Sequence, residues 1–87
     1  SVFNLSQNYP NPFNPSTKID FDLPEDVNVS IVLYDMTGRQ VATLMNEAKT
    51  AGYYSVQFDA ASLSSGIYIY TLRANGFTST KKMLLVK

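Results

Sequence analysis

Short runs of alternating apolar and polar side chains are the feature of this sequence that most constrains its fold. In residues 16–23 (STKIDFDL), Ile19, Phe21 and Leu23 alternate with charged residues. A period of two places successive side chains on opposite faces of a β-strand, whereas a helix needs a period of about 3.6 residues. No stretch keeps the helical period convincingly, so we expect a chain built from half-buried strands.

Five further segments carry strand signals, and turn-forming residues separate them. The predicted strands cover residues 27–36, 39–45, 54–59, 66–74 and 77–87. Asn75-Gly76 is the strongest hairpin signal, because both residues tolerate positive φ. Six to seven short strands at this spacing predict an all-β fold, an immunoglobulin-like antiparallel β-sandwich.

Two of these regions need a further interpretation. Residues 27–36 gain Val32 and Tyr34 on their second face, so we predict a central strand that is covered on both faces. Residues 46–50 are polar with little periodicity and stay outside the predicted strands. As an alternative, residues 42–48 could wind into one helical turn.

Residues 1–15 form a Pro-rich segment that leads into the sandwich. Pro10, Pro12 and Pro15 exclude a helix and a central strand, since each lacks an N–H and has a fixed φ. We expect an extended, turn-rich segment that Tyr9 and Phe13 pin to the body of the domain.

The length of the chain fits one domain, and its balance of charges gives no electrostatic preference for a partner. It has 87 residues, 45% of them hydrophobic, which fits a single folded domain over residues 1–87. Seven basic residues balance seven acidic ones, so the net charge gives no long-range attraction to nucleic acid or to an anionic membrane. The first residues lack the features of a signal peptide, and we expect the chain to come from a larger protein.

Candidate catalytic groups are few. The sequence has no His and no Cys, which excludes a Ser-His-Asp triad, His-ligated metals and a thiol nucleophile. Asp20 and Asp22 share a strand face, about 6.5–7 Å apart, within the range of an inverting glycosidase pair. So short a domain leaves no room for a substrate cleft, so we interpret the pair as a solvated strand face. We expect no enzymatic activity, no cofactor and no small-molecule substrate.

Two groups of surface residues are candidates for a binding site, and each also has an ordinary structural explanation. Glu25 and Asp26, with a nearby strand carboxylate from Asp20 or Asp22, could form a calcium site, although the spacing of a dedicated calcium loop is missing. The ordinary explanation is a charged turn.

Exposed aromatic rings are the second alternative. Tyr53 precedes a strand whose inward set begins at Tyr54, so Tyr53 should face outwards. With Tyr9 or Phe77 it could stack on a sugar. The ordinary explanation is that these rings cover the ends of the sandwich.

Tyr68 has a structural explanation. Residues 63–68 (LSSGIY) resemble the corner of immunoglobulin-type sandwiches, where a Tyr hydroxyl reaches back to the main chain a few residues upstream. We predict a tyrosine corner at Tyr68 that contributes to stability and not to binding.

Four stretches of the sequence resemble one known family. They are residues 5–17 (LSQNYPNPFNPST), the hairpin of residues 33–41, residues 63–70 (LSSGIYIY) and residues 81–87 (KKMLLVK). Together they resemble the type A C-terminal sorting domain of the bacterial type IX secretion system. The Pro-rich segment is the most specific part, although immunoglobulin-like modules of flagellar hook-capping type begin similarly. The ending favours the sorting domain, since that family's domain lies at the extreme C-terminus.

The resemblance implies a function in protein transport. An N-terminally attached cargo protein reaches the periplasm by the general export route, and the domain folds there. The outer-membrane secretion translocon binds the domain, and a sortase-like cysteine peptidase then removes it, with the scissile region at or before Ser1. The cargo ends at the cell surface or is secreted. On this interpretation the domain is an address label, and the chemistry belongs to its partner.

A label that is recognised in the folded state needs a distinctive edge or end. The final strand, residues 77–87, is the expected recognition element, with Lys81, Lys82 and Lys87 as its cations. The turn Ser64-Ser65-Gly66 could join it. The alternative function is a non-cleaved accessory module, a carbohydrate-binding or spacer domain of a surface enzyme, because folds of this kind host many functions.

Overall fold

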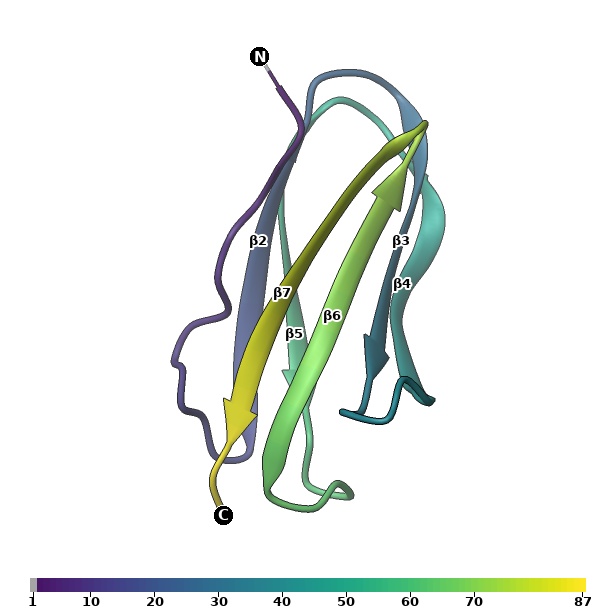
Figure 1. Ribbon diagram of the computed structural model, residues 1–87. Coiled ribbons are helices and arrows are strands. Elements are labelled where there is room, and N and C mark those ends of the chain that lie inside the picture. The colour runs from purple at the N-terminus through teal and green to yellow at the C-terminus, as the bar shows by residue number, and fades with distance from the viewer. Residues whose placement is uncertain (1) are drawn as a thin grey trace.

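The computed structural model describes residues 2–87 and consists of two packed β-sheets (Figure 1). The strands are β1 (Asn4–Leu5), β2 (Ser16–Leu23), β3 (Val27–Tyr34), β4 (Gln40–Lys49), β5 (Gly52–Asp59), β6 (Gly66–Ala74) and β7 (Phe77–Leu85). One sheet has the order β1-β2-β5 and the other β4-β3-β6-β7, and all neighbouring strands are antiparallel. The predicted all-β sandwich is confirmed. Residues 2–87 contain no candidate for a membrane-spanning helix.

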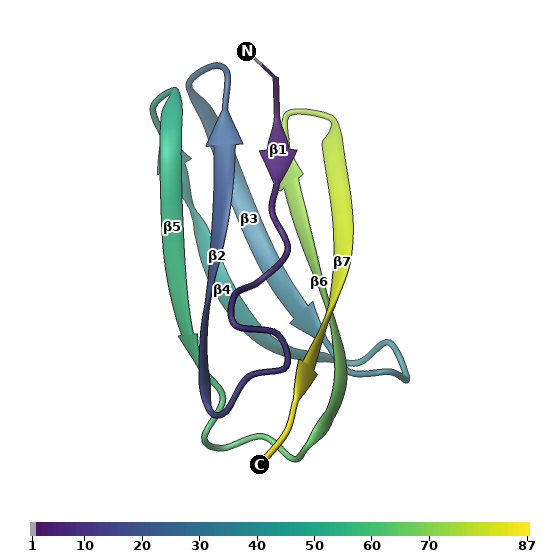
Figure 2. The same cartoon turned by 90° about the vertical axis from the view of Figure 1, so that its left-hand side faces the viewer.

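The strand order is that of an immunoglobulin-like sandwich. β1, β2 and β5 correspond to strands A, B and E of that fold, and β3, β6 and β7 correspond to C, F and G. β4 extends the second sheet beside β3. Figure 2 looks onto the three-stranded sheet, with β3 and β4 behind it. Because β5 and β6 lie in different sheets, residues 60–65 form a corner between the layers.

The period of two places the core between the two sheets. Ile19 and Phe21 of β2 are 0% and 1% exposed, and they face the equally buried Ile31 and Leu33 of β3 and Tyr70 of β6. Burying such a side chain stabilises the fold by about 1.5–3 kcal/mol. The hydrophobic pattern therefore specifies which face of each strand turns inwards.

The predicted hairpin turn is also confirmed. Asn75 and Gly76 have φ angles of 46° and 85°, and they join Ala74 directly to its partner Phe77. Two central residues with positive φ match the right-handed twist of the strands that they connect.

β4 departs from the predictions made for this region. It extends to Lys49, so residues 46–49 belong to a strand and residues 42–48 form no helical turn. Its pairing with β3 is irregular at two points, between Ile31 and Val32 and between Leu33 and Tyr34. Residues 46–49 pair regularly with residues 27–30, but they are mostly polar, and for this reason the pattern did not show that the strand extends to Lys49.

β3 is central, as predicted, but one of its faces is open. It lies between β4 and β6, and Val29, Ile31 and Leu33 are buried on its inner face. Val32 and Tyr34, on the outer face, are only partly buried. The prediction that both faces are covered is therefore wrong, because no second layer packs on this side of the sheet in residues 2–87.

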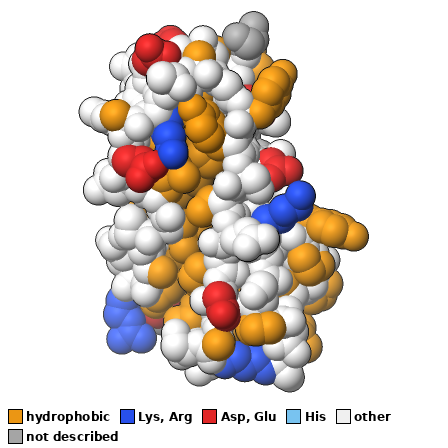
Figure 3. Space-filling view, turned by 180° about the vertical axis from the view of Figure 1, so that it is seen from behind, with side chains coloured by type: hydrophobic (Ala, Val, Ile, Leu, Met, Phe, Trp, Pro, Cys, Tyr) orange, Lys and Arg blue, Asp and Glu red, His pale blue; other side chains and the backbone are white. Residues whose placement is uncertain are grey.

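The two lateral edges of the sandwich differ in what covers the gap between the sheets. On one side, β4 and β5 lie at the margins of their sheets, and partly buried apolar side chains such as Leu44, Met45 and Val56 lie between them. Figure 3 shows this side, with apolar side chains gathered in a band along the molecule.

The Pro-rich segment closes the other side. The main chain of Tyr9 pairs with Lys18 of β2, and Phe13 pairs with Leu85 of β7. Phe13 is 2% exposed and packs in the core, which confirms it as a pin. The Tyr9 side chain is 72% exposed, so Tyr9 anchors the segment through its main chain and not through its ring.

Candidate recognition surface

The Ser64-Ser65-Gly66 turn and the last residue contact each other at one end of the sandwich. The N–H of Lys87 donates to Ser65 Oγ at 3.0 Å, and the Lys87 ammonium donates to the carbonyl oxygen of Ala61 at 2.6 Å. Gly66 begins β6 opposite Leu85 with a φ of 155°, a conformation that side chains disfavour. Four of the six predicted recognition residues therefore share one surface.

Tyr68 fixes the position of this turn. Its hydroxyl donates a hydrogen bond of 2.6 Å to the carbonyl oxygen of Ser64, four residues upstream, near the start of the strand that corresponds to F. The side chain is 7% exposed. This is the contact expected of a tyrosine corner, and its contribution to stability stays a prediction.

Lys81 and Lys82 lie on opposite faces of β7. Lys81 is paired with the inward-facing Tyr70, and Lys82 is paired with Ile69, whose side chain faces outwards. Successive side chains of a strand point to opposite faces, so the two cations do not act as one patch. Lys82 is exposed on the outer face, whereas Lys81 lies half-buried at the margin between the sheets.

The edge of β7 is only partly open. The main chain of Leu84 donates to Asn11 Oδ1 and accepts from the N–H of Phe13, both at 2.9 Å. The carbonyl oxygen of Lys82 accepts from Gln7 Nε2. The final strand is thus an edge strand, as expected, but the Pro-rich segment already occupies its last third. A partner that pairs with the main chain of β7 has access to its first residues only.

A buried hydrogen-bond network holds the Pro-rich segment in place, and the sequence interpretation missed it. The hydroxyl of Tyr70 accepts from the N–H of Asn8 and donates to the carbonyl oxygen of Ser6, both at 2.8 Å. Asn8 Nδ2 donates to Thr17 Oγ1 at 3.0 Å. Burial raises the pKa of Tyr70 to about 12, although the Asn8 N–H opposes this rise. The network was not predictable because Asn8 and Tyr70 are 62 residues apart.

The carboxylates considered for catalysis or calcium do not form a site. Asp20 is exposed and Asp22 half-exposed on β2, beside a shallow open depression. The Glu25 carboxylate accepts from Asn75 Nδ2 at 2.7 Å, and that of Asp26 accepts from the N–H of Ala51 at 2.9 Å. Residues 2–87 contain no group of three or more His, Cys, Asp or Glu placed to hold a metal ion. These acids instead tie neighbouring turns together or face solvent.

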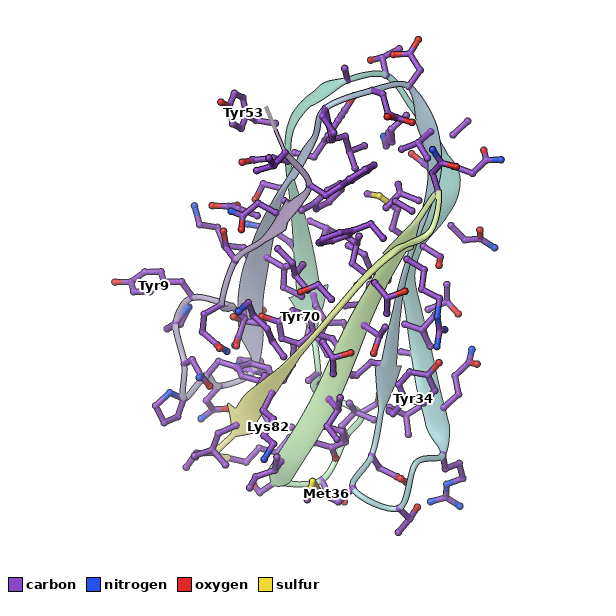
Figure 4. The ribbon with its side chains drawn as sticks, turned by 45° about the horizontal axis from the view of Figure 1, so that its top comes forward. Tyr9, Tyr34, Met36, Tyr53, Tyr70 and Lys82 are labelled. Carbon is purple, nitrogen blue, oxygen red and sulfur yellow. The ribbon has the colours of Figure 1, made fainter. Side chains whose placement is uncertain are left out.

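The aromatic residues considered for sugar binding are also separated. Tyr53 is 85% exposed and lies opposite Asp22, whereas Tyr9 lies opposite Lys18, four residues away along β2. Phe77 is not available, because its ring stacks on Phe3 with centroids 5.0 Å apart. Figure 4 shows Tyr9 and Tyr53 projecting from the molecule at different heights. They do not form a continuous platform.

The fold defines a class: a small immunoglobulin-like β-sandwich. The chain matches the family described as the secretion system C-terminal sorting domain, over residues 7–87. It therefore belongs to the C-terminal sorting domains of the type IX secretion system, which direct the secretion of an attached cargo protein. It is a secretion signal domain and not an enzyme. Membership implies interaction with the secretion machinery and a cargo that is secreted or displayed at the cell surface.

A solved structure supports the fold. The chain is similar to a part of dimeric latent PorU from Porphyromonas gingivalis, with a TM-score of 0.72 and 23% sequence identity. The match covers 99% of this chain and 10% of that protein, so it concerns a single domain of a much longer chain. No curated protein matches the sequence.

Proposed function

We propose that this domain is recognised, in its folded form, by the outer-membrane translocon of the type IX system. The cargo is attached to the N-terminus of the domain and passes through the periplasm on its way to the cell surface. A sortase-like cysteine peptidase then removes the domain, at or before Ser1, a position outside the described residues. The observation that carries the proposal is the contact between Lys87 and Ser65, which holds the segment after β7 against the turn that Tyr68 fixes.

The recognition surface consists of Ser64, Ser65, Gly66, Lys82 and Lys87, with Lys81 beside it. The turn is held by the Tyr68 hydroxyl, and the last strand is held by β6 on one side and by the Pro-rich segment on the other. A surface that is rigid in the folded state loses little conformational entropy when a partner binds. This favours recognition of the folded domain over recognition of an extended tail.

The direct test is the removal of residues 81–87 from a cargo fusion, which should trap the cargo in the periplasm. This deletion also removes Met83 and Leu85, which are 1% and 0% exposed in the core. A trapped cargo could then result from unfolding alone. The deletion therefore needs a companion variant that leaves the core intact.

That companion is Lys82→Glu combined with Lys87→Glu, because both side chains are exposed. Its control is Lys18→Glu combined with Lys49→Glu, which makes the same change of charge away from the recognition surface. Because Lys49 is paired with Glu47, thermal unfolding checks that the control is folded. We expect periplasmic retention of cargo with the first pair and normal delivery with the second, measured by cell fractionation. Surface delivery with both Lys82 and Lys87 reversed would contradict the assigned residues.

A non-cleaved accessory module that binds sugar is the second candidate, and the exposure of Tyr53 favours it. Intact-mass analysis of the mature parent protein separates the two functions. A sorting label is missing from the mature cargo, whereas an accessory module is retained. Glycan binding that is lost in Tyr53→Ala would support the accessory module.

A further inference from the structure

The outer face of the four-stranded sheet carries a continuous apolar area near the C-terminal end. Ile69 lies between Tyr34 of β3 and Lys82 of β7, and Ile67 lies opposite Leu84 on the same face. We call Tyr34, Ile67, Ile69 and Leu84 the outer patch. Ile67 and Leu84 are 43% and 37% exposed. These side chains adjoin on two neighbouring rows of the sheet and are therefore contiguous, and contiguous exposed apolar side chains are the kind of surface that partners use.

The outer patch continues into the neighbouring turn. Met36, in the turn after β3, is 58% exposed. Figure 4 shows Tyr34, Met36 and Lys82 toward the same end of the molecule. This is also the end at which β6 begins and β7 ends, so the outer patch borders the Ser64-Ser65-Gly66 turn.

The charges of the chain are segregated although their sum is zero. Residues 66–87 contain Arg73, Lys81, Lys82 and Lys87 and no acidic residue. The first 65 residues contain all seven acidic residues and the other three basic ones. The β6–β7 hairpin with its tail therefore carries a formal charge of +4, and the rest of the chain carries −4.

This segregation has a direct consequence for the outer patch. Arg73 lies opposite Thr78 and Lys82 opposite Ile69, so both cations belong to the outer face of the hairpin. The carboxylates of Asp20, Asp22 and Asp59 lie on the other sheet. Asp35, next to Tyr34 in the turn after β3, is paired with Arg39 at 3.2 Å. The outer patch therefore has an apolar centre with Lys82 beside it, and Arg73 lies farther along the same face.

We propose that the outer patch docks onto a protein surface of the secretion machinery that is apolar at its centre and bordered by carboxylates. The inference rests on the proposed function and adds the chemistry of the partner. Opposite charge at the border speeds up association and fixes the orientation of the complex, and burial of the apolar residues supplies affinity. The partner then recognises the outer face of the sheet in addition to the turn and Lys87.

The number of cations favours a protein over an anionic lipid surface. Membrane attraction by charge takes a cluster of about 4–8 basic residues, and the outer face presents two. The seven acidic residues of the domain would oppose approach to an anionic surface. A second copy of the chain would have to use its acidic sheet, which gives a head-to-tail contact that builds rings or filaments and not a two-fold dimer.

The test measures binding of the 87-residue chain to purified outer-membrane components of a type IX translocon in detergent. Ile67→Ser with Leu84→Ser removes exposed apolar groups, and Lys82→Glu reverses one cation. The matched controls, Tyr53→Ser and Lys18→Glu, change the other sheet. We expect at least about a tenfold loss of affinity both for Ile67→Ser with Leu84→Ser and for Lys82→Glu. The controls should lose less than about twofold.

Ionic strength provides a second readout. Raising it from about 0.01 M to about 1 M shortens the Debye length from about 30 Å to about 3 Å, so association of the wild-type domain should slow markedly. Lys82→Glu should reduce this dependence, and Ile67→Ser with Leu84→Ser should leave it unchanged. Thermal unfolding of each variant checks that it is folded.

Each other outcome overturns the inference. If these variants bind as tightly as the wild-type domain, the contact lies elsewhere on the domain, and the proposed function still stands. Self-association that the same substitutions abolish would make a second copy the occupant. Binding to phosphatidylglycerol vesicles that Lys82→Glu abolishes would make it a lipid surface. If a cargo fused to the wild-type domain is not exported at all, that result contradicts the proposed function itself.

Discussion

The hydroxyl of Tyr70 and the main-chain N–H of Asn8 are joined by a hydrogen bond of 2.8 Å across 62 residues of sequence. Tyr70 is 0% and Asn8 2% exposed. The bond connects the centre of β6 with the Pro-rich segment, and the same hydroxyl donates to Ser6. The Pro-rich segment is therefore a part of the folded domain and not a linker that precedes it.

Replacement of Tyr70 by Phe should destabilise the domain. The ring stays in the core, but the buried N–H of Asn8 loses its acceptor, which costs about 1–3 kcal/mol. Urea denaturation should show a lower midpoint with an unchanged slope. Tyr34→Phe, on the outer face, is the matched control and should change stability by less than about 0.5 kcal/mol. Equal midpoints for Tyr70→Phe and the wild type would contradict the role of the network.

The same residue predicts a loss of stability at alkaline pH. Burial raises the pKa of Tyr70 from 10.0 to about 12, so the fold favours the neutral hydroxyl. The contribution of this group is complete below pH 10 and is lost as the pH rises through about 12. Tyrosinate absorbance and the free energy of unfolding, followed together, measure this effect. Tyr70→Phe should show a weaker pH dependence in the same range.

Replacement of Tyr68 by Phe should have a smaller effect. It removes the bond to the carbonyl oxygen of Ser64, at the partly exposed corner, and we expect a loss of about 0.5–1.5 kcal/mol. Thermal unfolding of the two variants compares them directly. An unchanged melting temperature would remove the tyrosine corner as a source of stability.

Replacement of Phe13 by Ala should be more damaging than any loss of a hydroxyl. Phe13 is 2% exposed, and a buried Phe→Ala change costs about 3–5 kcal/mol. A domain of this size has a net stability on the order of 4–13 kcal/mol, so the variant should be at or near unfolding. Tyr9→Ala removes another aromatic ring of the segment, one that is 72% exposed, and is the control. Similar melting temperatures for the two variants would show that the segment is dispensable.

The turn between β3 and β4 should be sensitive to acid. The Thr37 hydroxyl, followed by the N–H of Arg39, lowers the pKa of Asp35 from 3.8 to about 2. The Asp35 carboxylate therefore supports the turn above pH 3.8, and this support is lost as the pH falls through about 2. Carboxyl titration by NMR should show the low value. Thr37→Val should raise it toward 3.8, and an unchanged value in that variant would contradict the assigned cause.

Much of the fold was readable from side-chain order. Alternation in β2 identified Ile19 and Phe21 as core residues, and Asn75-Gly76 identified the last hairpin. The full extent of β4 was not readable, because residues 46–49 are mostly polar and exposed and so show no alternation, although they pair regularly with β3. The open outer face of β3 was missed for a different reason: apolar residues such as Val32 and Tyr34 look the same in a sequence whether or not a second layer covers them.

The candidate surface was predictable in part. Ser64-Ser65-Gly66 and Lys87 come together as proposed, but Lys81 and Lys82 diverge because adjacent residues of a strand face opposite ways. The segregation of charge is present in the sequence, although the total of zero conceals it. Its meaning depends on the pairing of β6 with β7, which places Arg73 and Lys82 on one outer face.

Most of the strands, their inward faces and the family can be read from the residues alone, because they depend on local order and on motifs within a few residues. Which distant residues meet depends on how the strands pair and the sheets pack. The contact of Asn8 with Tyr70, the cover over the edge of β7 and the apolar patch beside Lys82 all join segments separated along the chain. Such contacts arise from the pairing of distant strands and the packing of distant segments, and no local pattern encodes them.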